Sequence, residues 1–187
     1  MTVKSIIKLA SSLLNRKDLI SYLDSGNTTD EERVLQDVET LVTTYNVIAE
    51  ELSTIYNYVS YTQKLTVSNG VLKYSQFTYN PVKILSVKDM NGDDVECTIL
   101  PTELRTNTTR IEVKYTYVPP KRKIVEESDF TNTPIKEGVI AYGVVTEYCL
   151  IKGMYEEAGL WHDKYLNGLN HVLSNGKSKK LKGRVWW

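Results

Sequence analysis

The sequence has 187 residues, of which 41% are hydrophobic and 25% charged, and its formal net charge at pH 7 is zero. This composition is ordinary for a globular domain, and no apolar run is long enough to predict a transmembrane helix. Two cysteines, Cys97 and Cys149, are too few for a disulfide framework, and the N-terminal residues lack a secretory signal pattern. We therefore expect a protein of the cytoplasm with two buried free thiols.

The first half of the chain has the apolar spacing of helices, which we expect over residues 3–62. One amphipathic helix begins at Val3, and a second short one ends before Gly26. Thr29 and Glu32 have the spacing of a capping box at the start of a long helix. Its apolar residues keep helical period to about residue 60.

Residues 63–118 change to the pattern of antiparallel strands. Asn69-Gly70 and Asn91-Gly92 are dipeptides that favour tight turns. Apolar and polar residues alternate strictly over 111–117, which predicts a strand with one exposed face. We expect four or five strands here. The loop over 119–133 is charged, and we expect it to be ordered only where another segment docks it.

Two closing helices follow. Thr133-Pro134 has the pattern of an N-cap with proline in the first turn. The helix that follows, to Ile151, is apolar nearly all round, which is typical of a central helix of a bundle. Gly153 separates it from a last helix with an apolar stripe that ends at Leu173.

These elements predict an α+β fold: a small helical bundle with one long helix, interrupted by an antiparallel β insertion, plus an extended C-terminal tail. We expect a single domain over residues 1–187, with its parts in the order helices 3–62, β insertion 63–118, loop 119–133, closing helices 134–173 and tail 174–187.

The usual motifs of catalysis and metal binding do not fit. Gly176-Lys177-Ser178 resembles the end of a phosphate-binding loop, but the required first glycine is replaced by His171. The acidic residues around Gly92 fit a hairpin turn better than a calcium loop. His162 and His171 point to nearly opposite sides of one helix, and adjacent acids such as Glu126-Glu127 predict a solvated face. We therefore expect no enzyme activity, no catalytic residue, no metal and no cofactor.

The charge of the chain is concentrated at its C-terminal segment. Residues 174–187 carry five basic residues and no acid, so the other 173 residues carry 18 basic and 23 acidic residues. An acidic body is not typical of a general nucleic-acid coat. Two tryptophans end the tail, and each can bury about 150–250 Å² in a partner pocket. The predicted partner-binding residues are Lys177, Lys179, Lys180, Lys182, Arg184, Val185, Trp186 and Trp187.

The string YCLIKGMYEEAGLWHDKY, from Tyr148 to Tyr165, resembles the two closing helices of head–tail connector (neck adaptor) proteins of tailed bacteriophages. In those proteins a glycine joins the helices and a Glu-Ala step precedes an aromatic stripe. The order of elements and the basic tail with terminal aromatics are also similar.

This resemblance implies a structural virion protein in the neck region, assembled in the host cytoplasm. It implies a homo-oligomeric ring of roughly twelve copies, with head-to-tail contacts between them. The implied partners are the portal protein, which the C-terminal arms enter, and a downstream neck or tail protein. Genomic DNA would pass through the ring without specific binding, and no membrane is involved.

Two alternatives stay open. One is a tail-completion or stopper protein of the same neck. The other is a nucleic-acid-binding module that uses Lys121-Arg122-Lys123 and the tail, with Trp186 and Trp187 as stacking platforms for bases.

Overall fold

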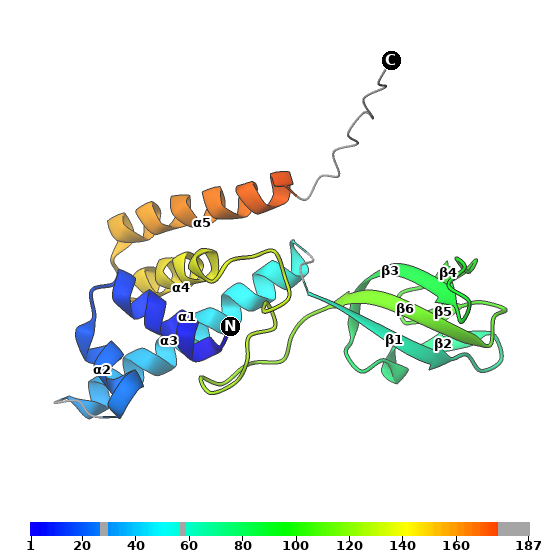
Figure 1. The fold of residues 1–187 in the computed structure, drawn as a ribbon, viewed down its shortest axis with the longest axis horizontal. Helices are drawn as coiled ribbons and strands as arrows, with labels where there is room; N and C mark the ends of the chain where they lie inside the picture. The colour runs from blue at the N-terminus through cyan, green and yellow to red at the C-terminus, as the bar shows by residue number, and fades with distance from the viewer. Residues whose placement is uncertain (27–29, 57–58, 176–187) are drawn as a thin grey trace, which may run out of the picture. The chain divides into compact units, whose positions relative to one another are not determined.

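A computed structural model describes residues 1–26, 30–56 and 59–175, which form five α-helices and two small antiparallel sheets (Figure 1). The predicted α+β class is confirmed. The chain forms two compact units, one from residues 1–45 together with the chain from Pro134 onward, and one from residues 46–133. The organisation as one domain stays a prediction. Within the described ranges, none of the helices has the length and apolarity needed to cross a membrane.

The helical unit is arranged around one apolar helix. It contains α1 (Val3–Leu13), α2 (Lys17–Ser25), the first part of α3 (Glu31–Thr54), α4 (Glu137–Ile151) and α5 (Tyr155–Asn175). Helix α4 packs against both α1 and α5 and lies between them (Figure 1). Its buried residues lie all round its axis, as the sequence predicts for a central helix.

Two predicted helix boundaries are wrong. Helix α3 ends at Thr54 and not near residue 60. Ile55, which the pattern places on the apolar face of the helix, is 65% exposed, and Val59 is buried directly ahead of strand β1 (Ser60–Thr66). The β-branched and aromatic residues that extended the helical period favour a strand. Helix α4 begins at Glu137 and not at Pro134, because Thr133 closes a turn onto the Phe130 carbonyl. The predicted cap Thr29 lies outside the described residues.

Helices α4 and α5 form a hairpin with a glycine at its turn. Gly153 has a φ of +74°, a conformation that side chains rarely adopt. Its N–H donates to the Leu150 carbonyl at 3.1 Å, and the N–H of Met154 donates to the Cys149 carbonyl at 2.8 Å. These two bonds form a Schellman motif, which satisfies carbonyl groups at the end of α4.

The second unit contains both sheets. Strands β1, β6 (Arg110–Tyr117) and β3 (Pro81–Asp89) pair in the order β1-β6-β3. Strands β2 (Val71–Lys73), β5 (Glu103–Arg105) and β4 (Thr98–Ile99) pair in the order β2-β5-β4. The described part of the chain thus has six strands, more than the four or five expected.

The two predicted turns are present. Asn69 and Gly70 have φ values of +53° and +74°, and Gly92 has a φ of +93°. The Asn69-Gly70 turn connects strands of different sheets, because β1 pairs with β6 while β2 pairs with β5.

Strand β6 supplies the centre of the larger sheet. Ile111, Val113 and Tyr115 are fully buried, as the alternating pattern predicts. Thr116 is also buried, although the pattern predicts it on an exposed face. The Tyr115 ring meets Phe77 edge-on at 4.9 Å, and its hydroxyl donates to Oε1 of Gln63 at 3.1 Å.

Helices α4 and α5 pack closely at Gly168, which has no side chain. A Cβ atom on Gly168 would lie 2.8 Å from Cγ2 of Val139. Valine is stiff at χ1 and cannot swing aside. We expect Gly168→Ala to lower the free energy of unfolding by about 1–3 kcal/mol, measured by urea denaturation.

A matched control lies on the same helix. A Cβ atom on Gly159 would meet nothing within 4 Å, so Gly159→Ala should stabilise the protein by about 0.5–1 kcal/mol through helix propensity. The pair Gly168→Ala with Val139→Ala should cost less than the sum of the single changes. Equal free energies of unfolding for Gly168→Ala and Gly159→Ala would contradict the close packing at Gly168.

Candidate partner-binding groove

A buried carboxylate joins three parts of the helical unit. The side chain of Asp37 on α3 is only 4% exposed. Its Oδ2 lies 2.8 Å from Nη1 of Arg16, and its Oδ1 lies 2.7 Å from Nζ of Lys152. Arg16 also donates to the Tyr148 hydroxyl at 3.3 Å. The cluster therefore connects α3 to the α1–α2 turn and to the end of α4.

The two cations reach this carboxylate from matching helix ends. The N–H of Asn15 donates to the Ser12 carbonyl, and the N–H of Arg16 donates to the Ser11 carbonyl. This is a second Schellman motif, with Asn15 at a φ of +55°. Lys152 is the C-cap of α4, where the helix dipole favours a cation.

The charges in the cluster change the pKa values of its members. Burial alone would raise the pKa of Asp37, but the hydrogen bonds and charges of Lys152 and Arg16 outweigh burial and lower it. Burial and the negative charge of Asp37 raise the pKa of Tyr148 to about 12. Near neutral pH the cluster thus places the Asp37 carboxylate between two cations with a neutral tyrosine beside them, and Arg16 also pairs with the carboxylate of Asp18 at 2.6 Å.

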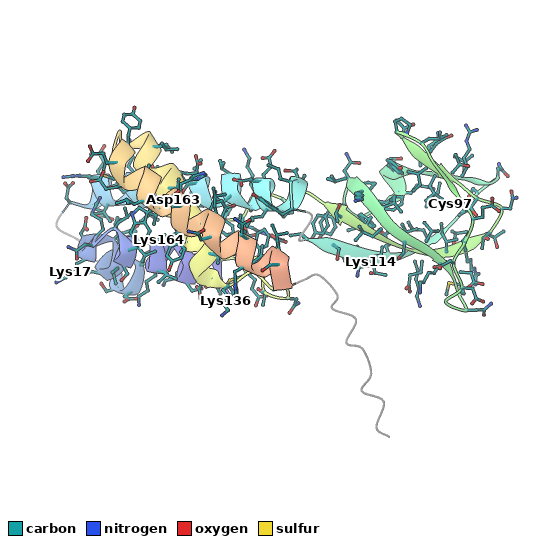
Figure 2. The ribbon with its side chains drawn as sticks, turned by 90° about the horizontal axis from the view of Figure 1, so that it is seen from above. Lys17, Cys97, Lys114, Lys136, Asp163 and Lys164 are labelled. Atoms are coloured by element: carbon teal, nitrogen blue, oxygen red, sulfur yellow. The ribbon has the colours of Figure 1, made fainter. Side chains whose placement is uncertain are left out.

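A groove of about 730 Å³ opens above this cluster. One wall is formed by α5, where Leu160 is 66% exposed and the Trp161 ring stacks on Tyr142 at 5.8 Å. Lys164, which projects from α5 (Figure 2), lies with its Nζ 4.0 Å from the centroid of the Trp161 ring. The residues that line the groove are Leu13, Leu14, Arg16, Arg33, Gln36, Asp37, Tyr148, Cys149, Lys152, Met154, Glu157, Leu160, Trp161 and Lys164.

The lining combines apolar side chains, with Leu160 exposed and Leu13, Leu14, Met154 and Trp161 half-buried, with four cations against two acids. Such a surface is complementary to an acidic segment that carries apolar side chains. Cys149 is buried, and burial raises the pKa of its thiol, so it does not supply a ready thiolate.

Sequence reasoning did not identify this groove, although α3 contains a signal for it. Asp37 follows Val34 by three residues and precedes Leu41 by four, so it occupies a core position of the amphipathic face. A carboxylate at such a position requires partners of opposite charge. The identity of those partners could not be read from the sequence, because they come from distant turns.

The predicted partner-binding residues of the tail, from Lys177 to Trp187, lie outside the described residues. The basic triplet proposed for nucleic-acid binding is described. Its central residue, Arg122, is paired with the carboxylate of Asp129 at 2.7 Å from Nε to Oδ2. That pairing leaves Lys121 and Lys123 as the exposed cations of the triplet.

The other sequence motifs keep structural roles. The carboxylate of Asp89 accepts hydrogen bonds from the N–H groups of Asn91 and Asp93, as a hairpin turn requires. Across residues 1–26, 30–56 and 59–175, no group of three or more histidine, cysteine, aspartate or glutamate residues could hold a metal ion.

No family model matches the sequence, and no curated protein shows significant similarity to it.

We expect Asp37→Asn to destabilise the protein by about 2 kcal/mol, because it removes the counter-charge of Lys152 and leaves Arg16 with the more exposed Asp18 as its carboxylate partner. A fully buried pair would cost about 3–5 kcal/mol, but the side chains of Arg16 and Lys152 are 24% and 36% exposed. The matched control is Asp24→Asn, since Asp24 is 52% exposed in its pair with Lys8 and should cost about 0.5 kcal/mol or less.

The destabilisation caused by Asp37→Asn should become smaller at low pH. The folded pKa of Asp37 lies below its ordinary value of 3.8, so its stabilisation is complete above that value and is lost as the pH falls through the folded pKa. The difference in the free energy of unfolding between the parent and Asp37→Asn should therefore shrink as the pH falls below about 4. A difference that stays constant from pH 7 to pH 3 would contradict the ion cluster.

Proposed function

We propose that the protein is a structural virion component, a head–tail connector that forms a ring on the portal of a tailed bacteriophage. It would link the capsid to the tail and leave a channel for DNA. The observation that carries this proposal is the α4–α5 hairpin. The string from Tyr148 to Tyr165 that resembles such connectors forms two packed helices with Gly153 at their turn.

The arrangement of charge supports the same proposal. The body of the chain has more acids than bases, and an acidic channel does not hold passing DNA. The basic tail suits an acidic surface on the portal. In a ring, many weak tail contacts act together, so avidity exceeds the affinity of each contact.

The helical unit also offers a surface of the kind that an assembly protein needs. The groove above Asp37 presents apolar side chains and cations, and among the helices that line it α4 packs against both α1 and α5. A surface carried by packed helices has a smaller ordering cost on binding than a flexible segment.

The stoichiometry of a complex with the portal tests the proposal. The protein is mixed with purified portal rings, and the mass of the complex is measured by native mass spectrometry. We expect roughly twelve copies per portal, the closure that matches a twelve-fold portal ring. One or two copies per portal would contradict a ring.

Deletion of residues 176–187 should leave the fold intact and abolish docking on the portal. Helix α5 ends at Asn175, and Leu169 is a fully packed position ahead of that end, so the deletion removes no described core residue. Docking is measured by co-sedimentation with portal rings, with circular dichroism as the control for folding. Docking of the truncated protein at parental affinity would contradict a role for the tail.

The two chemical components of the tail should separate in a salt series. Trp186→Ala with Trp187→Ala should weaken docking at every salt concentration, because apolar burial is little screened. Neutralising Lys179, Lys180, Lys182 and Arg184 should cost most at low salt, where exposed charges attract most strongly.

A further inference from the structure

We propose that the groove above Asp37 binds the exposed loop of residues 123–127, here called the display loop, from a second copy of this chain. This inference rests on the proposed ring and names the contact that would join its neighbouring copies. The display loop belongs to the second unit and the groove to the helical unit.

The display loop is held in a fixed conformation from its base. The side chain of Asn46 donates to the Arg122 carbonyl at 3.0 Å and accepts from the Arg122 N–H at 2.7 Å. The Arg122 guanidinium then forms a two-point ion pair with Asp129, whose side chain is 5% exposed. Phe130 is fully buried just beyond it. The sequence predicts that this loop is ordered only where another segment docks it. In the structure the docking segment is α3, which anchors the loop through Asn46.

The tip of this anchored loop presents apolar and acidic groups together. Val125 is 81% exposed, the highest value among the exposed large hydrophobic residues of the described chain. Glu126 closes a turn onto the N–H of Lys123, and Glu127 is exposed beside it. Because Arg122 and Asp129 hold both ends of the loop, seating Val125 in a partner should cost less conformational entropy than it would in an unanchored loop.

The groove is complementary to this tip in both respects. Leu160 and Trp161 provide an apolar wall for a small branched side chain. Arg33 and Lys164 are exposed at the groove and can attract the carboxylates of the loop. The charge of the groove is positive, since its lining holds four cations and two acids and Asp18, outside the lining, pairs with one of the four, Arg16.

The loop and the groove are different surfaces of the chain, so the contact between two copies would be head-to-tail. Such a contact repeats from one copy to the next and closes into a ring if the rotation allows it. One local contact of this kind would therefore set how neighbouring copies are arranged in the proposed ring.

Disulfide trapping tests the inference with two variants of the full chain, each carrying one added cysteine in a background where Cys97→Ser and Cys149→Ala remove the native thiols. Val125→Cys carries the thiol on the loop, and Leu160→Cys carries it on the groove wall; both positions are exposed, so the fold should tolerate the changes. The variants are mixed at micromolar concentration under mild oxidation, and the disulfide between positions 125 and 160 is counted by mass spectrometry. A seated loop holds the thiols at an effective concentration near the millimolar range, so we expect trapping at least about tenfold faster than for the control pair.

The control pair replaces the loop variant with Ile99→Cys, which is 54% exposed and lies in the same unit. A second comparison adds Glu127→Lys or Glu96→Lys to the loop variant, since both change the net charge equally at exposed sites of that unit. Glu127→Lys should slow trapping several-fold, and Glu96→Lys should leave it unchanged. Raising the salt concentration should also slow trapping, because the charges are exposed.

Each outcome decides the inference. Fast trapping between copies, sensitive to Glu127→Lys alone, supports it. Equal rates for the test and control pairs, or an intramolecular disulfide in the double variant Val125→Cys/Leu160→Cys, would overturn it. The number of copies per portal separates failure of this inference from failure of the proposed function. A full ring without trapping contradicts the loop contact alone, whereas one or two copies per portal contradict the ring itself.

Discussion

The burial of the Asp37 carboxylate fixes where the connections of the helical unit must meet. A carboxylate that is 4% exposed cannot keep its charge without partners. Its two cations come from the α1–α2 turn and from the C-cap of α4. Each of these positions is set by a helix that ends in a left-handed residue, Asn15 or Gly153. Helix ends that are distant in the sequence are therefore held together by one side chain.

The groove follows from this constraint. The same turns that supply Arg16 and Lys152 end α1 and α4, so the two helix ends leave a hollow in front of the carboxylate that α5 borders. Asp37 neutralises part of the charge, and Arg33 and Lys164 add more at the edge. An ion cluster that stabilises the fold thus leaves an apolar surface with positive charge around it, on a chain whose body carries more acids than bases.

The sequence predicted those features that repeat along one element. Helix α4 is apolar all round and lies centrally, and the alternation of β6 places Ile111, Val113 and Tyr115 in the core, as expected. It did not predict where α3 ends, because apolar residues of a helix and of a following strand satisfy the same pattern over a few positions. The groove and the display loop were missed for a different reason. Both depend on single polar contacts between distant residues, such as Asn46 with Arg122, which no periodicity reveals.

The signs of the charges separate the two binding elements proposed for this chain. The tail carries five cations and no acid, and the groove lining has an excess of cations. Like charges at close range disfavour contact, so the tail of one copy is a poor occupant for the groove of the next. The display loop, with Glu126 and Glu127 beside an exposed valine, has the opposite sign. In the proposed ring the groove is therefore matched to a neighbouring copy and the tail to a different, acidic surface, which keeps contacts within the ring from competing with contacts to the portal.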